Sequence, residues 1–451
     1  MILLAASLIL FFGFFAEFIF KRFGIPDILF LIILGFLIGP FAFNYVTPDK
    51  VMGVAPVFTT FTLVFLLFDG AFKIRLSALI KEFSKSFVLT TYNFFISAAV
   101  VAVVMSISGF FLWQEGVPIK ISLLTGFLLG GVSSAFVIPT LKQLKVSDKI
   151  YSLLTMEGAL TDVFCIVFSL TMIKIFQINQ IGVQTSAIQL VQLFAVAGMV
   201  GLIGGILWIV LILHVFREHN YIMTIAYLFF IYVVAEFLKG SGALAALFFG
   251  LMLNNSKQLS SIIQGITARG RKERKGALEG ELGVSVTTPT ERTFYDQLSR
   301  FLKIFFFVYI GLLIDVNNTW ALVIGIVLSI LLMLSRTASK LLTKGMDQPN
   351  QRLVNSMFAR GLAAAAVAQF ALEAGVPHDD FITSVASVAI TGTIILSSIK
   401  ILLVKKYFSR NEIKLKPIGE AKLEKKKKKK KKKLDPNKKS IKSSNEKLRI
   451  K

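Results

Sequence analysis

The sequence predicts an all-α polytopic membrane protein, and three observations support this prediction. Hydrophobic residues make up 55% of the 451 positions, 43 residues are phenylalanine, and the mean hydropathy is +0.72. A soluble protein of this length could not bury so much apolar surface in one core. Apolar runs such as 86–112 and 188–213 exceed the ~20 residues that cross a hydrocarbon layer of ~30 Å. Charged residues, proline and glycine separate these runs.

About thirteen apolar segments follow one another along the chain. The first begins at residue 2 without a basic segment before it or a small-residue cleavage site after it. We therefore expect it to be a retained span and not a signal peptide. The expected spans are 2–20, 27–46, 51–71, 86–112, 119–140, 151–176, 188–215, 221–238, 242–255, 298–316, 319–343, 354–374 and 380–404.

Basic residues are distributed unevenly among the segments that connect these spans. One set of connections is rich in lysine and arginine, most clearly in the block 257–303, whereas the other set holds little beyond Lys50, Lys120 and Lys239. The positive-inside rule places the basic set in the cytoplasm, the N-terminus outside and the C-terminus inside. An odd number of spans requires the same arrangement. We therefore expect a multi-pass protein of the cell membrane in this orientation.

The sequence divides into a transmembrane domain and a basic tail. Residues 1–404 are expected to form the transmembrane domain, with a long charged cytoplasmic loop at about 256–297. Residues 405–451 hold 21 lysine and arginine residues against five acidic ones, including nine consecutive lysines at 425–433. Such a segment buries too little surface to fold. We expect a disordered cytoplasmic tail that contacts anionic lipids, at ~1 kcal/mol per basic residue near the surface, in preference to a nucleic-acid-binding arm.

Five charged side chains lie in or beside apolar spans: Asp69, Glu157, Asp162, Arg336 and Arg360. Placing a charge in the bilayer costs at least ~2.5–3.5 kcal/mol, so each one needs a partner, a wet cavity or a function. Two of the five have a simpler alternative. Asp69 could be an acid at the membrane interface, and the long side chain of Arg336 could extend toward the cytoplasm along its helix.

The acids Glu157 and Asp162 lie within one apolar segment, "YSLLTMEGALTDVFCIVFSLTMI". Asp162 has about ten residues of span on either side and is expected near the middle of the bilayer. At ~100° per residue the two side chains are ~140° apart around the helix, so one can face a cation path while the other finds a counter-charge. Thr161 adds a hydroxyl oxygen, and hard cations prefer carboxylate, hydroxyl, carbonyl and water oxygens. We expect Asp162 and Thr161 to be the ligands of a metal cation.

Two spans contain residues that interrupt membrane helices. In "LLGGVSSAFVIPTLK" (128–142), glycines, the hydroxyls of Ser133 and Ser134, and a proline interrupt an apolar run. The later segment "ARGLAAAAVAQFALEAG" (359–375) has an arginine–glycine pair followed by small residues. Broken helices at corresponding places in two inverted repeats are typical of secondary transporters, where they form an ion site. Small residues also pack ordinary membrane helices, which is the alternative.

A set of five motifs runs through the apolar part of the chain: "LLFDGAFKIRLSAL", "EGALTDVFCIVF", "GSGALAALFFGLML", "FLKIFFFVYIGLLID" and "ARGLAAAAVA". In this order they resemble the monovalent cation:proton antiporters of the NhaP-like sodium/proton exchanger type. The resemblance covers nearly everything except the tail.

This resemblance implies a homodimer whose protomers have about 13 transmembrane helices in inverted repeats, with two discontinuous helices in a mobile six-helix core domain. It implies that Asp162 carries the ion and the proton, and that Glu157 pairs with a core arginine. Arg336 is the preferred partner, and Arg360 is the second core arginine. Asp69 is implied to line a cytoplasmic funnel.

The sequence departs from the family pattern in two places. Thr161 precedes Asp162 where the family commonly has asparagine, and Ser133 and Ser134 stand where an acid is usual. Neither departure removes the essential carboxylate. Both leave the selected cation open: we expect Na⁺, with Li⁺ as a further substrate, and K⁺ is the alternative.

These residues predict an exchanger. Either a proton or a cation can neutralise Asp162, but not both, and only the neutralised site crosses the apolar barrier at low cost. If Glu157 stays ionised in an ion pair with Arg336, only Asp162 alternates between a bound cation and a bound proton, and exchange is electroneutral. A K⁺/H⁺ antiporter of the same fold, a cation channel and an ion-coupled symporter are the alternatives. The sequence contains no Walker A motif, no Cys/His metal cluster and no nucleophile elbow, so we expect neither an enzyme nor a cofactor beyond the transported Na⁺ and H⁺.

Overall fold

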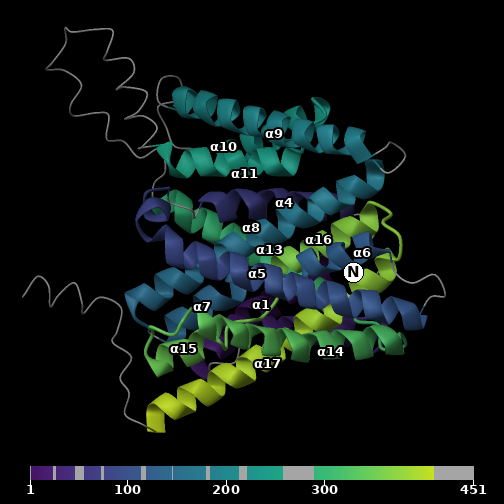
Figure 1. The fold of residues 1–451 in the computed structure, drawn as a ribbon, viewed down its shortest axis with the longest axis vertical. Coiled ribbons are helices and arrows are strands. Elements are labelled where there is room, and N and C mark those ends of the chain that lie inside the picture. The colour runs from purple at the N-terminus through teal and green to yellow at the C-terminus, as the bar shows by residue number, and fades with distance from the viewer. Residues whose placement is uncertain are drawn as a thin grey trace, which may run out of the picture.

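A computed structural model (Figure 1) describes residues 2–23, 27–45, 55–72, 76–112, 118–144, 146–178, 183–212, 221–256 and 289–410. Across these ranges every regular element is a helix, which confirms the all-α prediction. Most of the expected cytoplasmic loop, residues 257–288, and residues 411–451 of the basic tail lie outside the described residues.

The helices coincide with the expected apolar spans. Five of them are long and apolar enough to cross a membrane: Ser86–Leu112, Ile150–Phe176, Val191–Leu211, Thr319–Leu341 and Asp379–Lys406. The count of thirteen crossings and the inverted repeat stay predictions. In chain order the elements are α1 (Ile2–Phe23), α2 (Asp27–Ile38), α4 (Ala55–Phe72), α5 (Leu76–Leu112), α6 (Ile119–Leu128), α7 (Ser134–Leu144), α8 (Asp148–Ile178), α9 (Val183–Leu211), α10 (Tyr221–Phe237), α11 (Gly242–Asn254), α13 (Pro289–Leu312), α14 (Thr319–Ser335), the 3-10 helix η2 (Arg336–Leu341), α15 (Gln348–Val354), α16 (Leu362–Glu373) and α17 (Asp379–Arg410).

Both expected helix interruptions are present. Non-helical residues 129–133 separate α6 from α7, and residues 355–361 separate α15 from α16. Pro139 lies inside α7 and not at the break. The first interruption therefore coincides with the glycine and serine residues of the "LLGGVSS" segment and not with its proline.

Several helices extend beyond the boundaries that the sequence predicts; α5, for example, begins at Leu76 and not at 86. Helix α13 begins at Pro289, within the expected cytoplasmic loop, and proline suits a first helical position because its missing N–H has no intrahelical partner there. The first turns of α13 combine polar side chains such as Asp296 with the buried Tyr295, and this amphipathic pattern lowers the mean hydropathy to that of a loop. Helix α17 continues to Arg410, past the expected start of the tail at residue 405.

The helices build two hydrophobic clusters that share α4 and α13. One cluster joins these two helices to α9, α10 and α11. The other joins them to the broken helices and to α2, α5, α8, α14 and α17. In Figure 1, α9, α10 and α11 lie along one side of the molecule, α14, α15 and α17 lie along the opposite side, and α4, α8, α13 and α16 lie between them. Helices α4 and α13 therefore form the boundary between the two groups.

Helices α2 and α13 approach so closely that only glycine fits at their crossing. A Cβ atom added to Gly35 would lie 1.9 Å from the carbonyl oxygen of Val308, and one added to Gly311 would lie 2.2 Å from that of Ile32. Membrane helices without a hydrophobic force between them gain their association energy from such close backbone contact.

An alanine at Gly35 or Gly311 is expected to destabilise the protein, because its methyl group would push the two backbones apart. Overpacking of a close-packed interior costs ~1–3 kcal/mol. The measurement is the apparent melting temperature of the purified protein in detergent. Gly345→Ala is the matched control, since an added Cβ there meets nothing within 4 Å. Equal melting temperatures for all three variants would contradict the close crossing.

The same helix pair contains a buried ion pair that the sequence did not predict. Lys303 was counted with the basic residues of the block 257–303, although it falls within the expected span 298–316, and it lies inside α13, where it is 7% exposed. Its Nζ atom lies 2.5 Å from Oδ2 of Asp27, which is the first residue of α2. The pair was missed because its two members are 276 residues apart in the chain.

Candidate functional site

The two helix breaks cross and touch. The backbone N–H of Ser133 in the first break donates to the carbonyl oxygen of Ala359 in the second, at 2.8 Å. A Cβ atom on Gly361 would lie 2.0 Å from Oγ of Ser133, so glycine is required where the chains meet. The backbone N–H of Arg360 donates to Oγ1 of Thr393 on α17, at 3.1 Å. Backbone groups that helices would normally satisfy are therefore bonded across the crossing.

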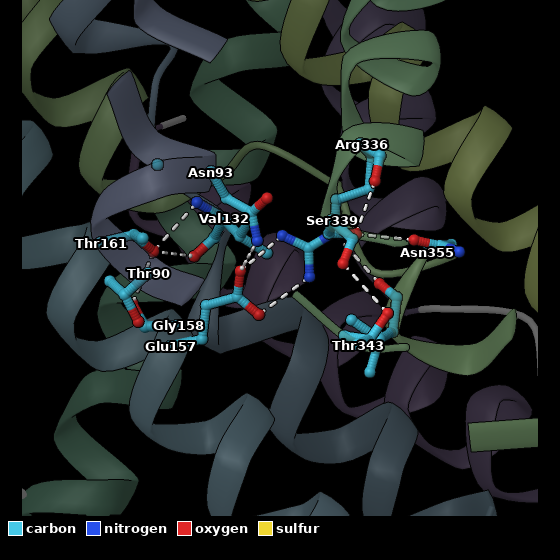
Figure 2. A network of polar contacts seen from close by, with 12 residues as sticks. Thr90, Asn93, Val132, Glu157, Gly158, Thr161, Arg336, Ser339, Thr343 and Asn355 are labelled. Atoms are coloured by element: carbon cyan, nitrogen blue, oxygen red, sulfur yellow. Dashed lines mark hydrogen bonds and ion pairs between the residues drawn. The ribbon is translucent and has the colours of Figure 1, made fainter. Parts of the chain in front are cut away.

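Thr161 of α8 holds the first break in place (Figure 2). Its Oγ1 atom accepts from the N–H of Val132 at 3.0 Å. The same hydroxyl lies 3.0 Å from the carbonyl oxygen of Val132 and 3.1 Å from that of Gly158, to either of which it can donate its hydrogen. A Cβ on Gly131 would lie 2.8 Å from the carbonyl oxygen of Thr161, so this glycine permits the contact.

The side chain of Asp162, on α8, lies at the N-terminus of α7, which is the second half of the first broken helix. Its Oδ2 atom accepts from the backbone N–H of Ser134 at 3.3 Å and from the Oγ–H of the same serine. The N-terminus of a helix carries a partial positive charge and favours an ionised carboxylate. Gly158, one turn earlier on α8, permits this approach, because an added Cβ would lie 3.1 Å from the Cα of Ser134.

Glu157 forms a buried ion pair with Arg336 (Figure 2). The Nη1–Oε1 distance is 2.5 Å and the Nη2–Oε2 distance is 2.8 Å. The Nδ2 atom of Asn93 on α5 donates to the same Oε1, at 2.9 Å. Glu157 is 1% exposed and Arg336 is 4% exposed. The alternative that Arg336 extends to the cytoplasm is therefore wrong, and the expected contact between these two side chains is present.

Arg336 also reaches the second helix break. Its Nε atom donates to the carbonyl oxygen of Val354, the last residue of α15, at 3.1 Å. Three residues further along η2, Oγ of Ser339 lies 2.6 Å from Oδ1 of Asn355, as Figure 2 shows. A single guanidinium therefore links the acid of α8 to the second broken helix.

Arg360 does not take the place of Arg336 beside Glu157. Its Nη1 atom donates to the carbonyl oxygens of Gly130 and Gly131, at 3.1 and 2.7 Å. These oxygens follow the C-terminus of α6, the negative end of that half-helix. Lys400 of α17 contacts the second break in the same way, with its Nζ atom 3.3 Å from the carbonyl oxygen of Asn355. Each half-helix that ends at a break therefore has a cation at its C-terminus.

Asp69 lies on α4, next to the helix that bears Asp162. The residue is 5% exposed and accepts from Oγ of Ser299 on α13 at 2.8 Å. A Cβ atom on the adjacent Gly70 would lie 3.6 Å from Cγ2 of Val163, so α4 and α8 are in contact here. The burial of Asp69 disfavours the alternative of an acid exposed at the membrane interface.

The arrangement offers oxygen ligands to a hard cation at one place. Asp162 supplies a carboxylate, and Ser134 supplies a hydroxyl oxygen that contacts it. The Oγ atom of Ser133 is buried and has no hydrogen-bond partner among the described residues, so it is available as a further ligand. Thr161 is brought next to Asp162, but its hydroxyl is bonded to the break. Such oxygens suit an alkali cation.

Sequence reasoning missed three polar residues of this region. Asn93 donates to Glu157, Asn355 bonds to Ser339 in the second break, and Thr393 bonds to the backbone of Arg360. The first has a usable signal, because an asparagine in the apolar run "TTYNFFISAAV" needs a polar partner in the bilayer.

The chain is similar to known proteins over most of its length. The sequence profile described as "Sodium/hydrogen exchanger, transmembrane" matches residues 6–405. The K(+)/H(+) antiporter NhaP2 of Shewanella oneidensis is 25% identical over 271 residues, which are 59% of this chain and 44% of that protein. The Na(+)/H(+) antiporter 1 of Methanocaldococcus jannaschii is 26% identical over 253 residues, which are 52% of this chain and 56% of that protein. These matches thus cover about half the length of the relatives.

The fold is shared with solved structures. The sodium proton antiporter MjNhaP1 from Methanocaldococcus jannaschii at pH 8 matches with a TM-score of 0.67 and 21% identity, over 90% of this chain and 100% of that chain. A second structure of MjNhaP1 matches with a TM-score of 0.63 and 20% identity, over 91% and 96% of the two chains. The shared fold and the match of the profile to nearly the whole apolar region agree with the resemblance drawn from the motifs. The chain belongs to the sodium/hydrogen exchanger family.

Proposed function

We propose that this protein is a secondary active transporter that exchanges a monovalent cation, Na⁺ in the first place, for H⁺. The observation that carries the proposal is the position of Asp162. Its carboxylate lies within a span, at the N-terminus of a half-helix and beside the crossing of two breaks. A carboxylate in such a place is costly unless it binds a cation or a proton. Membership of the sodium/hydrogen exchanger family supports a transporter over an enzyme.

Competition at one carboxylate couples the two fluxes. Asp162 and the hydroxyl oxygens of Ser133 and Ser134 hold a cation, whereas a proton takes the same carboxylate in its absence. Only the neutralised site passes the apolar barrier at low cost, so each return requires a load. Asp69, beside this helix on α4, attracts cations toward the site from the cytoplasmic side. Alternating access follows when the broken helices move past α4 and α13.

The ion pair of Glu157 determines the number of protons. Three donors, two from Arg336 and one from Asn93, contact Glu157, and in this proposal Glu157 keeps these contacts throughout the transport cycle. Asp162 is then the one carboxylate that alternates between a cation and a proton, and exchange is one for one and electroneutral. A flux that changes with an imposed membrane potential would contradict this stoichiometry.

A K⁺/H⁺ antiporter of the same fold is the second candidate. A specific observation favours it: one similar protein is named a K(+)/H(+) antiporter, while another is named a Na(+)/H(+) antiporter. The serines at 133 and 134 and the threonine at 161 provide neutral hydroxyls where the family pattern has an acid and an amide. A site with fewer charges binds a cation less tightly, which suits an ion that is abundant in cells.

The proposal also includes the location, the orientation and the oligomeric state of the transporter. We place the protein in the cell membrane as a homodimer, with the N-terminus outside and the C-terminus in the cytoplasm, as the charge distribution and the resemblance imply. The basic tail contacts anionic lipid headgroups through its lysines. No bound cofactor is required, because Na⁺ and H⁺ are the cargo.

The test is proton flux in liposomes that hold the purified protein under an imposed pH gradient, with Na⁺, Li⁺ and K⁺ added in turn. A response to Na⁺ and Li⁺ supports the sodium exchanger. A response to K⁺ alone supports the second candidate, a K⁺/H⁺ antiporter of the same fold. Flux without counter-transport indicates a channel, and no response to any of the three cations would overturn the proposal.

A further inference from the structure

Helix α16 is rich in small side chains and packs against α4 and α13 as well as α8 and α17. Six of its twelve residues are alanine, and the rest are leucine, valine and phenylalanine apart from Gln369 and Glu373. Ala366 and Ala371 are fully buried. The two polar residues are the exception on this helix.

Gln369 and Glu373 connect α16 to both helices of the boundary. The Oη atom of Tyr309 on α13 donates to Oε1 of Gln369 at 2.8 Å. The Nε2 atom of Gln369 donates to Oε1 of Glu373 at 3.2 Å, one turn further along α16. Glu373 is also hydrogen-bonded to the side chain of Thr59 on α4. Four side chains from three helices thus form one chain of hydrogen bonds.

These four residues lie at the same end of the molecule. Thr59 lies in the first turns of α4, Tyr309 in the last turn of α13, and Glu373 is the final residue of α16. By the charge distribution, this is the end opposite to the basic connections, the outer end in the proposed orientation. Gln369 is 3% exposed and Thr59 is 1% exposed, whereas Tyr309 and Glu373 are half-buried, so the chain of hydrogen bonds is partly buried in this conformation.

A buried hydroxyl lies behind this chain of hydrogen bonds. Thr62 follows Thr59 by three residues and precedes Asp69 by seven, so the three polar side chains share one face of α4. The Oγ1 atom of Thr62 is buried and has no hydrogen-bond partner among the described residues. Polar groups therefore occur along this face of α4 from the outer end to Asp69, and the hydrogen bond between Thr59 and Glu373 spans the outer end.

We propose that Tyr309, Gln369, Glu373 and Thr59 form an outer latch, which holds α16 against α4 and α13 and closes the outer side of the passage. The inference rests on the proposed function, in which α16 must move past α4 and α13. Outward opening then requires these hydrogen bonds to break. Because one hydrogen bond contributes ~1 kcal/mol net, the loss of one member shifts the population of the outward-open state about fivefold.

The experiment measures how fast a thiol at position 62 reacts from the outer side. Cys165 is the only cysteine of the chain and is buried, so the wild type gives the background rate of thiol modification. Thr62→Cys is close to isosteric, and its modification by a membrane-impermeant thiol reagent is followed in liposomes. Tyr309→Phe in this background is expected to raise the rate about fivefold, and Gln369→Leu is expected to raise it further, because it removes two contacts.

Tyr227→Phe is the matched control, since the hydroxyl that it removes bonds, among the described residues, to the carbonyl oxygen of Gly204 on α9, at 3.2 Å. It should leave the rate unchanged. Equal rates for Tyr309→Phe and the parent would overturn the latch, and so would an unreactive thiol in vesicles that transport. Cation-driven proton flux is measured on the same vesicles. Absent flux in the wild type counts against the proposed function, whereas normal flux with equal labelling counts against the latch alone.

Discussion

Replacement of Asp162 by asparagine is expected to reduce cation-driven proton flux to the level of protein-free liposomes. The amide has nearly the same shape and can still accept from the N–H and Oγ–H of Ser134, so the fold should persist. It carries no charge for a cation and binds no proton at cellular pH, so neither cargo can load. The flux assay with Na⁺, Li⁺ and K⁺ measures the loss, and the melting temperature in detergent measures the fold.

Asp380→Asn is the matched control for this prediction. Asp380 is an exposed acid in the first turn of α17, and its replacement should leave the flux unchanged. Flux of wild-type size in Asp162→Asn would contradict the role of this carboxylate. A parallel fall in melting temperature would mean that the variant lost its fold and not its cargo.

Removal of Arg336 is expected to produce the largest loss of stability. Arg336→Ala leaves Glu157 buried without its cation and frees the carbonyl oxygen of Val354. Breaking one side of a buried ion pair costs ~3–5 kcal/mol. We expect a clear fall in the melting temperature, measured in detergent, while the cation affinity of the protein that remains folded is retained.

A double variant separates the charge from the packing. Glu157→Gln combined with Arg336→Met removes both charges and should recover part of the lost stability, since an uncompensated charge costs more than a missing pair. If the double variant is no more stable than Arg336→Ala, the ion pair does not stabilise the core in the way proposed. If cation affinity falls with Arg336→Ala, the guanidinium acts on the ion site directly.

The helical period predicted the division of roles between the two acids. Five residues separate Glu157 from Asp162, and the resulting angle of ~140° sends one side chain to Arg336 and the other to Ser134. The two breaks were also predictable, because glycines and serines in an apolar span leave backbone groups that need partners elsewhere. Both inferences depend only on local sequence.

The partners of these groups were not predictable from local sequence. Arg336 is 179 residues from Glu157 in the chain, and Arg360 is 230 residues from Gly130. Only the resemblance to a family suggested the first pair, and nothing suggested that Arg360 binds carbonyl oxygens. The ion pair of Lys303 with Asp27 was missed for the same reason, because 276 residues separate its two members.

The central claim is that a cation and a proton compete for the carboxylate of Asp162, and proton release on cation binding tests it most directly. Purified protein in weakly buffered detergent solution is titrated with Na⁺, and with K⁺ in parallel, while a pH indicator records released protons. The account predicts about one proton per bound cation for the wild type at pH values where the cation-free site is fully protonated, about half a proton at the pH of half-maximal release, and none for Asp162→Asn. Release that persists in Asp162→Asn, or cation binding that releases no proton from the wild type at any pH, would contradict it.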